Sequence, residues 1–105
     1  LLEDEKRLPY SDGYFDAVIS SSTLEHARYP WIVMQEIGRV LKRRRWCCIV
    51  VPSMYPEHRI AKDYWRVYPD GLRVLAEYGN LRVIEAKKLK VGPSMEISYL
   101  IARKR

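Results

Sequence analysis

The hydrophobic residues of this chain gather in short runs and stripes that predict alternating strands and helices. Residues 15–20 form an apolar run between Asp12-Gly13 and a serine cluster, and residues 46–51 form a second run that Pro52 ends. Runs without polar alternation are typical of strands buried on both faces, as in parallel sheets. We therefore expect two neighbouring parallel strands here.

A helix is predicted between these two strands. Pro30 fits its first turn, where a missing N–H costs nothing. Gln35, Glu36 and Arg39 are expected to face away from the core. The apolar stripe on the other side consists of Val33, Ile37, Val40 and Leu41. A strand, a helix and a strand joined over this length form a parallel crossover unit.

A second helix is predicted to open at Pro69 and to stop at Gly79-Asn80. The residues that share its apolar face are Leu72, Leu75 and Ala76. Residues 81–89 then indicate a strand, and a turn at residues 92–94 leads to a last strand with alternating apolar residues. Because this connection is short, the last strand is expected to run antiparallel to its neighbour.

The predicted order is strand-helix-strand-helix-strand-strand, which is an α/β layer. It amounts to the C-terminal half of a Rossmann-like, doubly wound sheet. Its first strand would be a bare edge with apolar residues on both faces, which natural domains avoid. We therefore expect residues 1–105 to be part of a larger domain, with this edge pairing with the rest of the domain or with a second copy.

Length and charge narrow the possibilities further. The 105 residues allow one small domain, and no apolar run approaches the roughly 20 residues that span a membrane. The net charge is +6, with the excess concentrated in residues 42–45 and 103–105. Such short basic clusters are usually solvated surface, and they do not interleave with aromatic residues, so binding of nucleic acid is not expected.

The two cysteines, Cys47 and Cys48, are adjacent within an apolar run. On a strand they point to opposite faces and cannot easily form a disulfide with each other. No spacing in the chain suits a metal site. The cysteines are therefore expected to be small core residues in a reducing, cytoplasmic compartment.

Five motifs in order resemble the class I S-adenosylmethionine-dependent methyltransferases, and in particular their type 11-like domain. They occupy residues 4–20, 24–26, 36–42, 63–66 and 69–72, and they read DEKRLPYSDGYFDAVIS, LEH, EIGRVLK, DYWR and PDGL. The resemblance implies methyl transfer from S-adenosylmethionine to an acceptor, which would be a small molecule or a glycan. The alternative is a catalytically inactive interaction module built on the same fold.

The chain departs from the family in two places. It contains no glycine-rich turn of the kind that holds the methionine part of the cofactor, so we expect residues 1–105 alone to have no useful cofactor affinity. The family's Lys-Pro-Gly-Gly is replaced by Lys42 followed by three arginines. Arginine at a position that needs positive φ costs about 1 kcal/mol if the turn is kept. Otherwise the helix runs on by a turn.

The resemblance assigns cofactor contacts to two parts of the chain. Asp4 matches the acidic residue that accepts a hydrogen bond from the adenine amino group, and the backbone N–H of Glu5 would face the adenine ring. Ser20, Ser21 and Ser22 follow the first strand, and ligands of open α/β sheets bind at such carboxyl ends. The alternative for the serines is a polar turn without a ligand.

His26 is the candidate catalytic residue, because an imidazole can act as a general base near neutral pH. Methyl transfer from a sulfonium is a direct displacement that positioning alone can accelerate. The alternative is therefore that His26 is a wall residue beside the cofactor.

The loop after the second strand is the candidate acceptor site, because it combines aromatic, imidazole and guanidinium groups as a polar pocket would. The candidate substrate-binding residues are Tyr55, His58, Tyr64 and Arg66. In the alternative, Tyr64 and Trp65 pack over the sheet and Arg66 pairs with Asp63 or Glu57.

Overall fold

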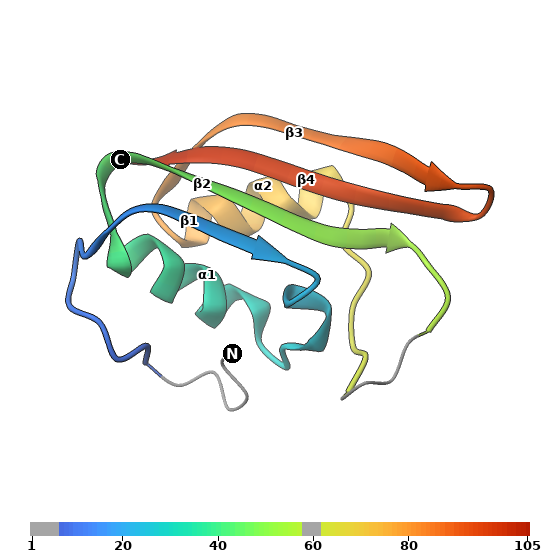
Figure 1. The fold of residues 1–105 in the computed structure, drawn as a ribbon, viewed down its shortest axis with the longest axis horizontal. Coiled ribbons are helices and arrows are strands. Elements are labelled where there is room, and N and C mark those ends of the chain that lie inside the picture. The colour runs from blue at the N-terminus through green and yellow to red at the C-terminus, as the bar shows by residue number, and fades with distance from the viewer. Residues whose placement is uncertain (1–6, 58–61) are drawn as a thin grey trace.

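The computed structural model describes residues 7–57 and 62–105, which form one mixed four-stranded sheet with two helices (Figure 1). The elements are β1 (Phe15–Ser21), the 3-10 turn η1 (Leu24–His26), α1 (Pro30–Val40), β2 (Leu41–Met54), α2 (Pro69–Tyr78), β3 (Leu81–Gly92) and β4 (Met95–Lys104). The strand order is β1-β2-β4-β3, with β1 parallel to β2 and the other pairs antiparallel. The predicted order of elements and the antiparallel last strand are confirmed.

Both helices bury their apolar faces in a single core on one side of the sheet. Val33 and Ile37 of the stripe predicted for α1 lie in this core, Val40 is buried, and Leu41 reaches the core from the start of β2. The face predicted for α2 is buried in the same core. Alternate residues of the inner strands meet them, and these are Cys47, Ile49, Val51, Leu100 and Ala102. In the described part of the chain, no helix combines the length and the apolar character needed to cross a membrane.

The opposite face of the sheet has no covering layer among residues 7–57 and 62–105. Ile19 on β1 is 78% exposed, and Trp46 on β2 is 44% exposed. The expectation that these two strands are buried on both faces is therefore wrong for the described residues. Cys47 is buried and Cys48 lies on the other face, and both are free thiols, as their adjacency on a strand predicted.

The basic segment after α1 belongs to β2. The helix ends at Val40, so it does not run on, and Arg44 takes a positive φ of 66°. The turn is therefore kept, and Arg44 occupies a conformation that favours glycine. Asp16 of β1 anchors the same segment, because its carboxylate lies 3.2 Å from Lys42 Nζ and 3.7 Å from Arg45 Nε.

The side of α1 expected to face solvent is largely covered. Gln35 is exposed as predicted, but Glu36 is only 8% exposed and the Arg39 side chain only 14%. The prediction that Glu36 and Arg39 face away from the protein is therefore wrong. The physical reason is that residues 8–12 pass over this side of the helix and bind both side chains.

The two helices touch through glycine. A Cβ added at Gly38 of α1 would lie 2.0 Å from the carbonyl oxygen of Gly79, and one added at Gly79 would lie 2.6 Å from the Met34 oxygen. No heavy atom can occupy either position without moving backbone. Gly79 caps α2, and Asn80 after it takes a φ of 60°, so the predicted stop at Gly79-Asn80 is confirmed.

Replacing Gly38 by alanine is expected to lower the free energy of unfolding by more than about 2 kcal/mol, because the new methyl group would collide with the Gly79 carbonyl. At an ordinary helix position the same change raises stability by about 1 kcal/mol. Urea unfolding of Gly38→Ala and of the exposed control Gln35→Ala measures the difference. Equal stability of Gly38→Ala and the parent would contradict the close approach.

Replacing Arg44 by glycine is expected to stabilise the chain by up to about 1 kcal/mol relative to Arg44→Ala, because only glycine adopts positive φ without steric cost. Both variants lose the same charge, so their difference in urea unfolding isolates the backbone term. An alanine variant as stable as the glycine variant would show that residue 44 is unstrained.

Candidate functional site

The carboxyl ends of β1 and β2 lie side by side and present their following loops at one edge of the molecule (Figure 1). Ser21 pairs with Val50, and Ser22 turns the chain sharply with a φ of 54°. The Ser22 N–H donates to the Val50 oxygen over 3.0 Å, which holds the turn against β2. The predicted serine cluster therefore stands where parallel sheets bind ligands.

A hollow of about 370 Å³ lies along β1, which is an edge strand of the described sheet. Ser20, Ser21 and Thr23 supply its polar groups, and Leu8 closes it from the preceding segment. The Ser20 hydroxyl is buried and has no hydrogen-bond partner in the described part of the chain. A buried hydroxyl in this state is well suited to a polar atom of a ligand. Ser22 contributes its backbone to the turn and does not line this hollow.

The loop that follows β2 folds back onto η1. The Glu25 carbonyl accepts hydrogen bonds from the N–H groups of Tyr64 (2.7 Å) and Trp65 (3.2 Å). The Trp65 indole donates to the Ala27 oxygen over 2.8 Å. Segments far apart in sequence therefore form one wall at the carboxyl edge of the sheet, and Trp65 fastens this wall rather than packing over the sheet.

His26 is held within this wall. Its Nδ1 lies 2.5 Å from the Lys62 carbonyl oxygen, and its Nε2 lies 3.8 Å from Oε2 of the buried Glu25. Since a carbonyl only accepts, Nδ1 is the protonated nitrogen. The His26 side chain is 14% exposed. The hydrogen bond at Nδ1 ties the imidazole to the loop, while the Glu25 carboxylate lies beyond hydrogen-bond distance of Nε2, which fits a wall residue.

Arg66 organises the candidate acceptor loop. Its guanidinium binds the Asp63 carboxylate in a bidentate manner over 2.7 and 3.0 Å. It also donates to the carbonyls of Tyr55 (3.2 Å) and Pro56 (3.0 Å). The hydrogen bonds that Arg66 donates to the Asp63 carboxylate raise the pKa of Arg66 further above its ordinary value. The structure thus shows the ion pair with Asp63 that was one of the two alternatives.

The aromatic candidates share a shallow hollow of about 290 Å³ with this arginine. Tyr55 and Tyr64 both line it, and both are exposed. Asp4, Glu5 and His58, which completed the predicted cofactor and acceptor sites, lie outside the described residues.

Sequence reasoning missed the contacts that hold the segment before β1. Glu36 Oε1 accepts the Leu8 N–H over 2.7 Å, and Arg39 Nη2 donates to the Leu8 oxygen over 3.0 Å. Arg39 Nη1 also binds the Tyr10 oxygen and the Asp12 carboxylate over 2.8 and 2.9 Å. Because Leu8 closes the hollow beside β1, this pair of helix residues positions one of its walls. The available signal was the spacing of Glu36 and Arg39, which places them one turn apart.

The ionisation of this network follows from its geometry. Arg39 hydrogen bonds lower the pKa of Glu36, and the Leu8 N–H acts in the same direction against the opposing effect of burial. Hydrogen bonding to Arg39 likewise lowers the pKa of the exposed Asp12 carboxyl. Both carboxylates raise the pKa of Arg39. The network is therefore fully charged at neutral pH.

The chain is similar to known proteins in part of its sequence and in its fold. Residues 1–49 match the family model described as a methyltransferase domain. No curated protein gives a significant match to the sequence. The chain spans about half the length of the solved structures that it resembles, with shares of 53%, 45% and 64% for the three described next.

These three structures share the Rossmann-like α/β fold with the chain. The [4+2]-cyclase SpnF is 19% identical over 96% of this chain, with a TM-score of 0.73. A 1,6-didemethyltoxoflavin-N1-methyltransferase of Burkholderia thailandensis, solved with S-adenosylhomocysteine bound, is 16% identical over 90%, with a TM-score of 0.74. An S-adenosylmethionine-dependent methyltransferase of Methanosarcina mazei is 14% identical over 95%, with a TM-score of 0.72.

Replacing Glu36 by glutamine is expected to destabilise the chain by about 1–3 kcal/mol at pH 7, because the charged hydrogen bonds to Arg39 and Leu8 are weakened. A carboxyl whose pKa is lowered on folding stabilises the fold above its ordinary value of 4.5, and this contribution is lost as the pH falls through the lowered value. Thermal unfolding between pH 7 and pH 3 should therefore depend less on pH in the variant. The control Glu77→Gln removes an exposed carboxylate outside this network and should change stability little. Identical pH profiles for Glu36→Gln and the parent would contradict the assignment.

Proposed function

We propose that the chain belongs to the class I S-adenosylmethionine-dependent methyltransferases and takes part in methyl transfer from that cofactor to a small-molecule or glycan acceptor; the family match of residues 1–49 and the fold shared with solved methyltransferases support this. The observation that supports this most is the joining of the β1 and β2 loops into one wall beside the hollow that holds the unpartnered Ser20 hydroxyl. Ligands of open α/β sheets bind at this edge.

The described residues fit the cofactor at this edge. Ser20 offers a buried hydroxyl that hydrogen-bonds a polar group, while Leu8 and Val33 offer apolar contact in the same hollow. When bound, S-adenosylmethionine supplies an electrophilic methyl group on its sulfonium. The chain's own contribution is to orient the two reactants and to exclude water, which provides much of the rate of a direct displacement. We propose that Asp4, Glu5, Ser21 and Ser22 also contact the cofactor.

The acceptor is proposed to lie against the loop after β2. Tyr55 and Tyr64 line the hollow there, and His58 is proposed to join them. Arg66 already donates all five of its N–H groups to Asp63 and to backbone carbonyls, so we propose that it shapes this loop for the acceptor and does not bind the acceptor itself. His26 is proposed to position the loop through Lys62, with no proton transfer required.

A second candidate function is an interaction module without catalysis, acting in a reducing cytoplasmic compartment. The uncovered sheet face, with Ile19 and Trp46 exposed, favours this alternative, because exposed apolar faces mark interfaces. One of the structures with this fold is a cyclase, so the fold alone does not fix methyl transfer. Partners would be the remainder of a larger domain or a second copy meeting β1.

Calorimetry with S-adenosylhomocysteine, on the protein as its gene encodes it, tests the proposed function. Binding is expected, and Ser20→Ala should weaken it by about five- to tenfold, because one hydrogen bond to the ligand is lost. Stability should hardly change, since the hydroxyl has no partner among the described residues. Ser94→Ala, in the exposed turn between β3 and β4, is the matched control.

The isolated residues 1–105 are expected not to bind the cofactor at micromolar concentration. Binding of neither S-adenosylhomocysteine nor S-adenosylmethionine by the full protein would contradict the proposed function and favour the interaction module. Equal affinities of Ser20→Ala and Ser94→Ala would remove Ser20 from the cofactor site.

A further inference from the structure

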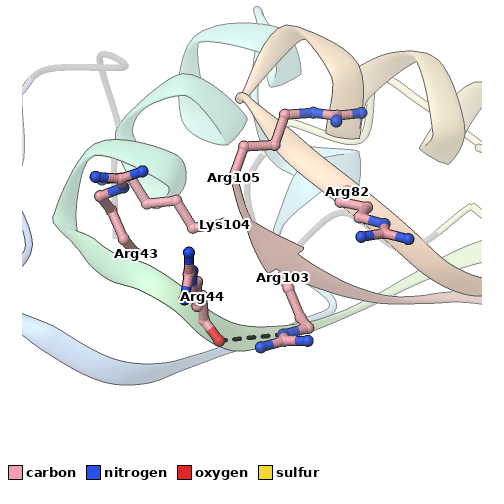
Figure 2. A pocket seen from close by; sticks show the side chains of 6 residues that line it. All are labelled: Arg43, Arg44, Arg82, Arg103, Lys104 and Arg105. Atoms are coloured by element: carbon pink, nitrogen blue, oxygen red, sulfur yellow. Dashed lines mark hydrogen bonds between the residues drawn. The ribbon is translucent and has the colours of Figure 1, made fainter.

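A second hollow, of about 490 Å³, lies at the opposite end of β2 from the candidate site (Figure 2). Its lining consists entirely of cationic residues, which are Arg43, Arg44, Arg82, Arg103, Lys104 and Arg105. They come from the start of β2, the start of β3 and the end of β4. From Arg44 to Ser53 the strand spans about 30 Å, so this hollow is separate from the loops at the carboxyl edge.

Several cations elsewhere in the described chain pair with carboxylates, and the cations of this hollow do not. Arg39, Arg66 and Lys88 each pair with a carboxylate. Lys42 and Arg45, which flank the hollow's own Arg43 and Arg44, pair with Asp16. No side-chain carboxylate among residues 7–57 and 62–105 pairs with any of the six lining residues. Concentrating like charges without a counter-charge is unfavourable, and a bound anion would offset that cost.

The floor of the hollow is fixed by backbone and ring contacts. Arg44 sits at a φ of 66°, and its carbonyl accepts the Nε–H of Arg103 over 3.1 Å. The Arg103 guanidinium also lies 5.1 Å from the centre of the Trp46 ring, its cross-strand neighbour. In Figure 2, Arg43 and Arg82 lie on opposite sides, with Arg44 and Arg103 between them. The Arg44–Arg103 hydrogen bond and the contact of Arg103 with Trp46 therefore fix one side of the hollow before a ligand arrives.

We propose that this hollow binds a compact anion with two or more phosphoryl groups. Guanidinium groups match phosphoryl oxygens through paired hydrogen bonds, and several of them around one hollow suit a ligand with several such groups. Among the described residues, the lining offers no side-chain carboxylate or amide that would recognise a base or a sugar. The affinity therefore resides in the phosphoryl groups, whether they belong to free oligophosphate or to the end of a nucleotide.

Titration calorimetry with inorganic tripolyphosphate tests the proposal on the full chain. One equivalent should bind, and raising the salt concentration should weaken binding steeply. The double variant Arg82→Gln/Arg105→Gln should bind at least about tenfold more weakly, because two exposed cations of the hollow are lost while the Arg103 contacts stay. Arg73→Gln/Lys90→Gln removes the same charge from exposed positions outside the hollow and should bind within about twofold of the parent.

Two further ligands identify the source of the phosphoryl groups. Adenosine triphosphate binding as tightly as tripolyphosphate indicates that a nucleotide end is accepted, and weaker binding indicates free oligophosphate. No tripolyphosphate binding, or equal weakening in both double variants, would overturn the proposal. A single-stranded oligonucleotide that binds much more tightly than tripolyphosphate would overturn it in favour of a nucleic-acid surface.

Discussion

The structure depends on Arg39 more than on any other single side chain. Its guanidinium binds the segment before β1 at Leu8, Tyr10 and Asp12. Its partner Glu36 accepts hydrogen bonds from Arg39 and from the Leu8 N–H. Its carbonyl also accepts the Gly13 N–H over 2.9 Å and lies 3.4 Å from Lys104 Nζ. One residue at the end of α1 thus ties together the entry into β1, the helix and the end of β4. Because Arg39 holds Leu8 in place and Leu8 lines the hollow beside β1, these contacts also shape that hollow.

The sequence predicted the helices and strands correctly where the pattern within a single helix or strand determines the structure. Apolar periodicity and proline placement located both helices, and the parallel and antiparallel pairings followed from the lengths of the connections. The failure at Glu36 and Arg39 has a clear cause. Periodicity identifies polar residues opposite the core, but it carries no information about a distant segment that folds over them. Burial on both faces of β1 was overestimated for a related reason. An apolar run shows that a strand can be buried on both faces, but it does not show whether the described part of the chain supplies an element to cover each face.

The position of the candidate site could be predicted from the sequence, but the roles of its individual residues could be predicted only in part. The serines at the end of β1 and the loop after β2 do lie at the same edge of the sheet, because the carboxyl ends of parallel neighbours coincide. The internal use of Arg66 was one of two alternatives that composition alone could not separate. The hydrogen bonds that join Tyr64 to η1 were beyond reach, since they depend on backbone atoms that every residue possesses.

The contact between Gly38 and Gly79 has a consequence for how this fold can diverge. A carbonyl of one helix end fills the space where the other helix would carry a side chain. The two positions therefore cannot vary independently: a larger residue at either one requires α2 to shift against α1, and α2 carries the chain directly into β3. A relative with a side chain at the equivalent of residue 38 should consequently show a wider helix crossing and a displaced outer hairpin. The identity of one small residue would then act as a marker of subfamily geometry.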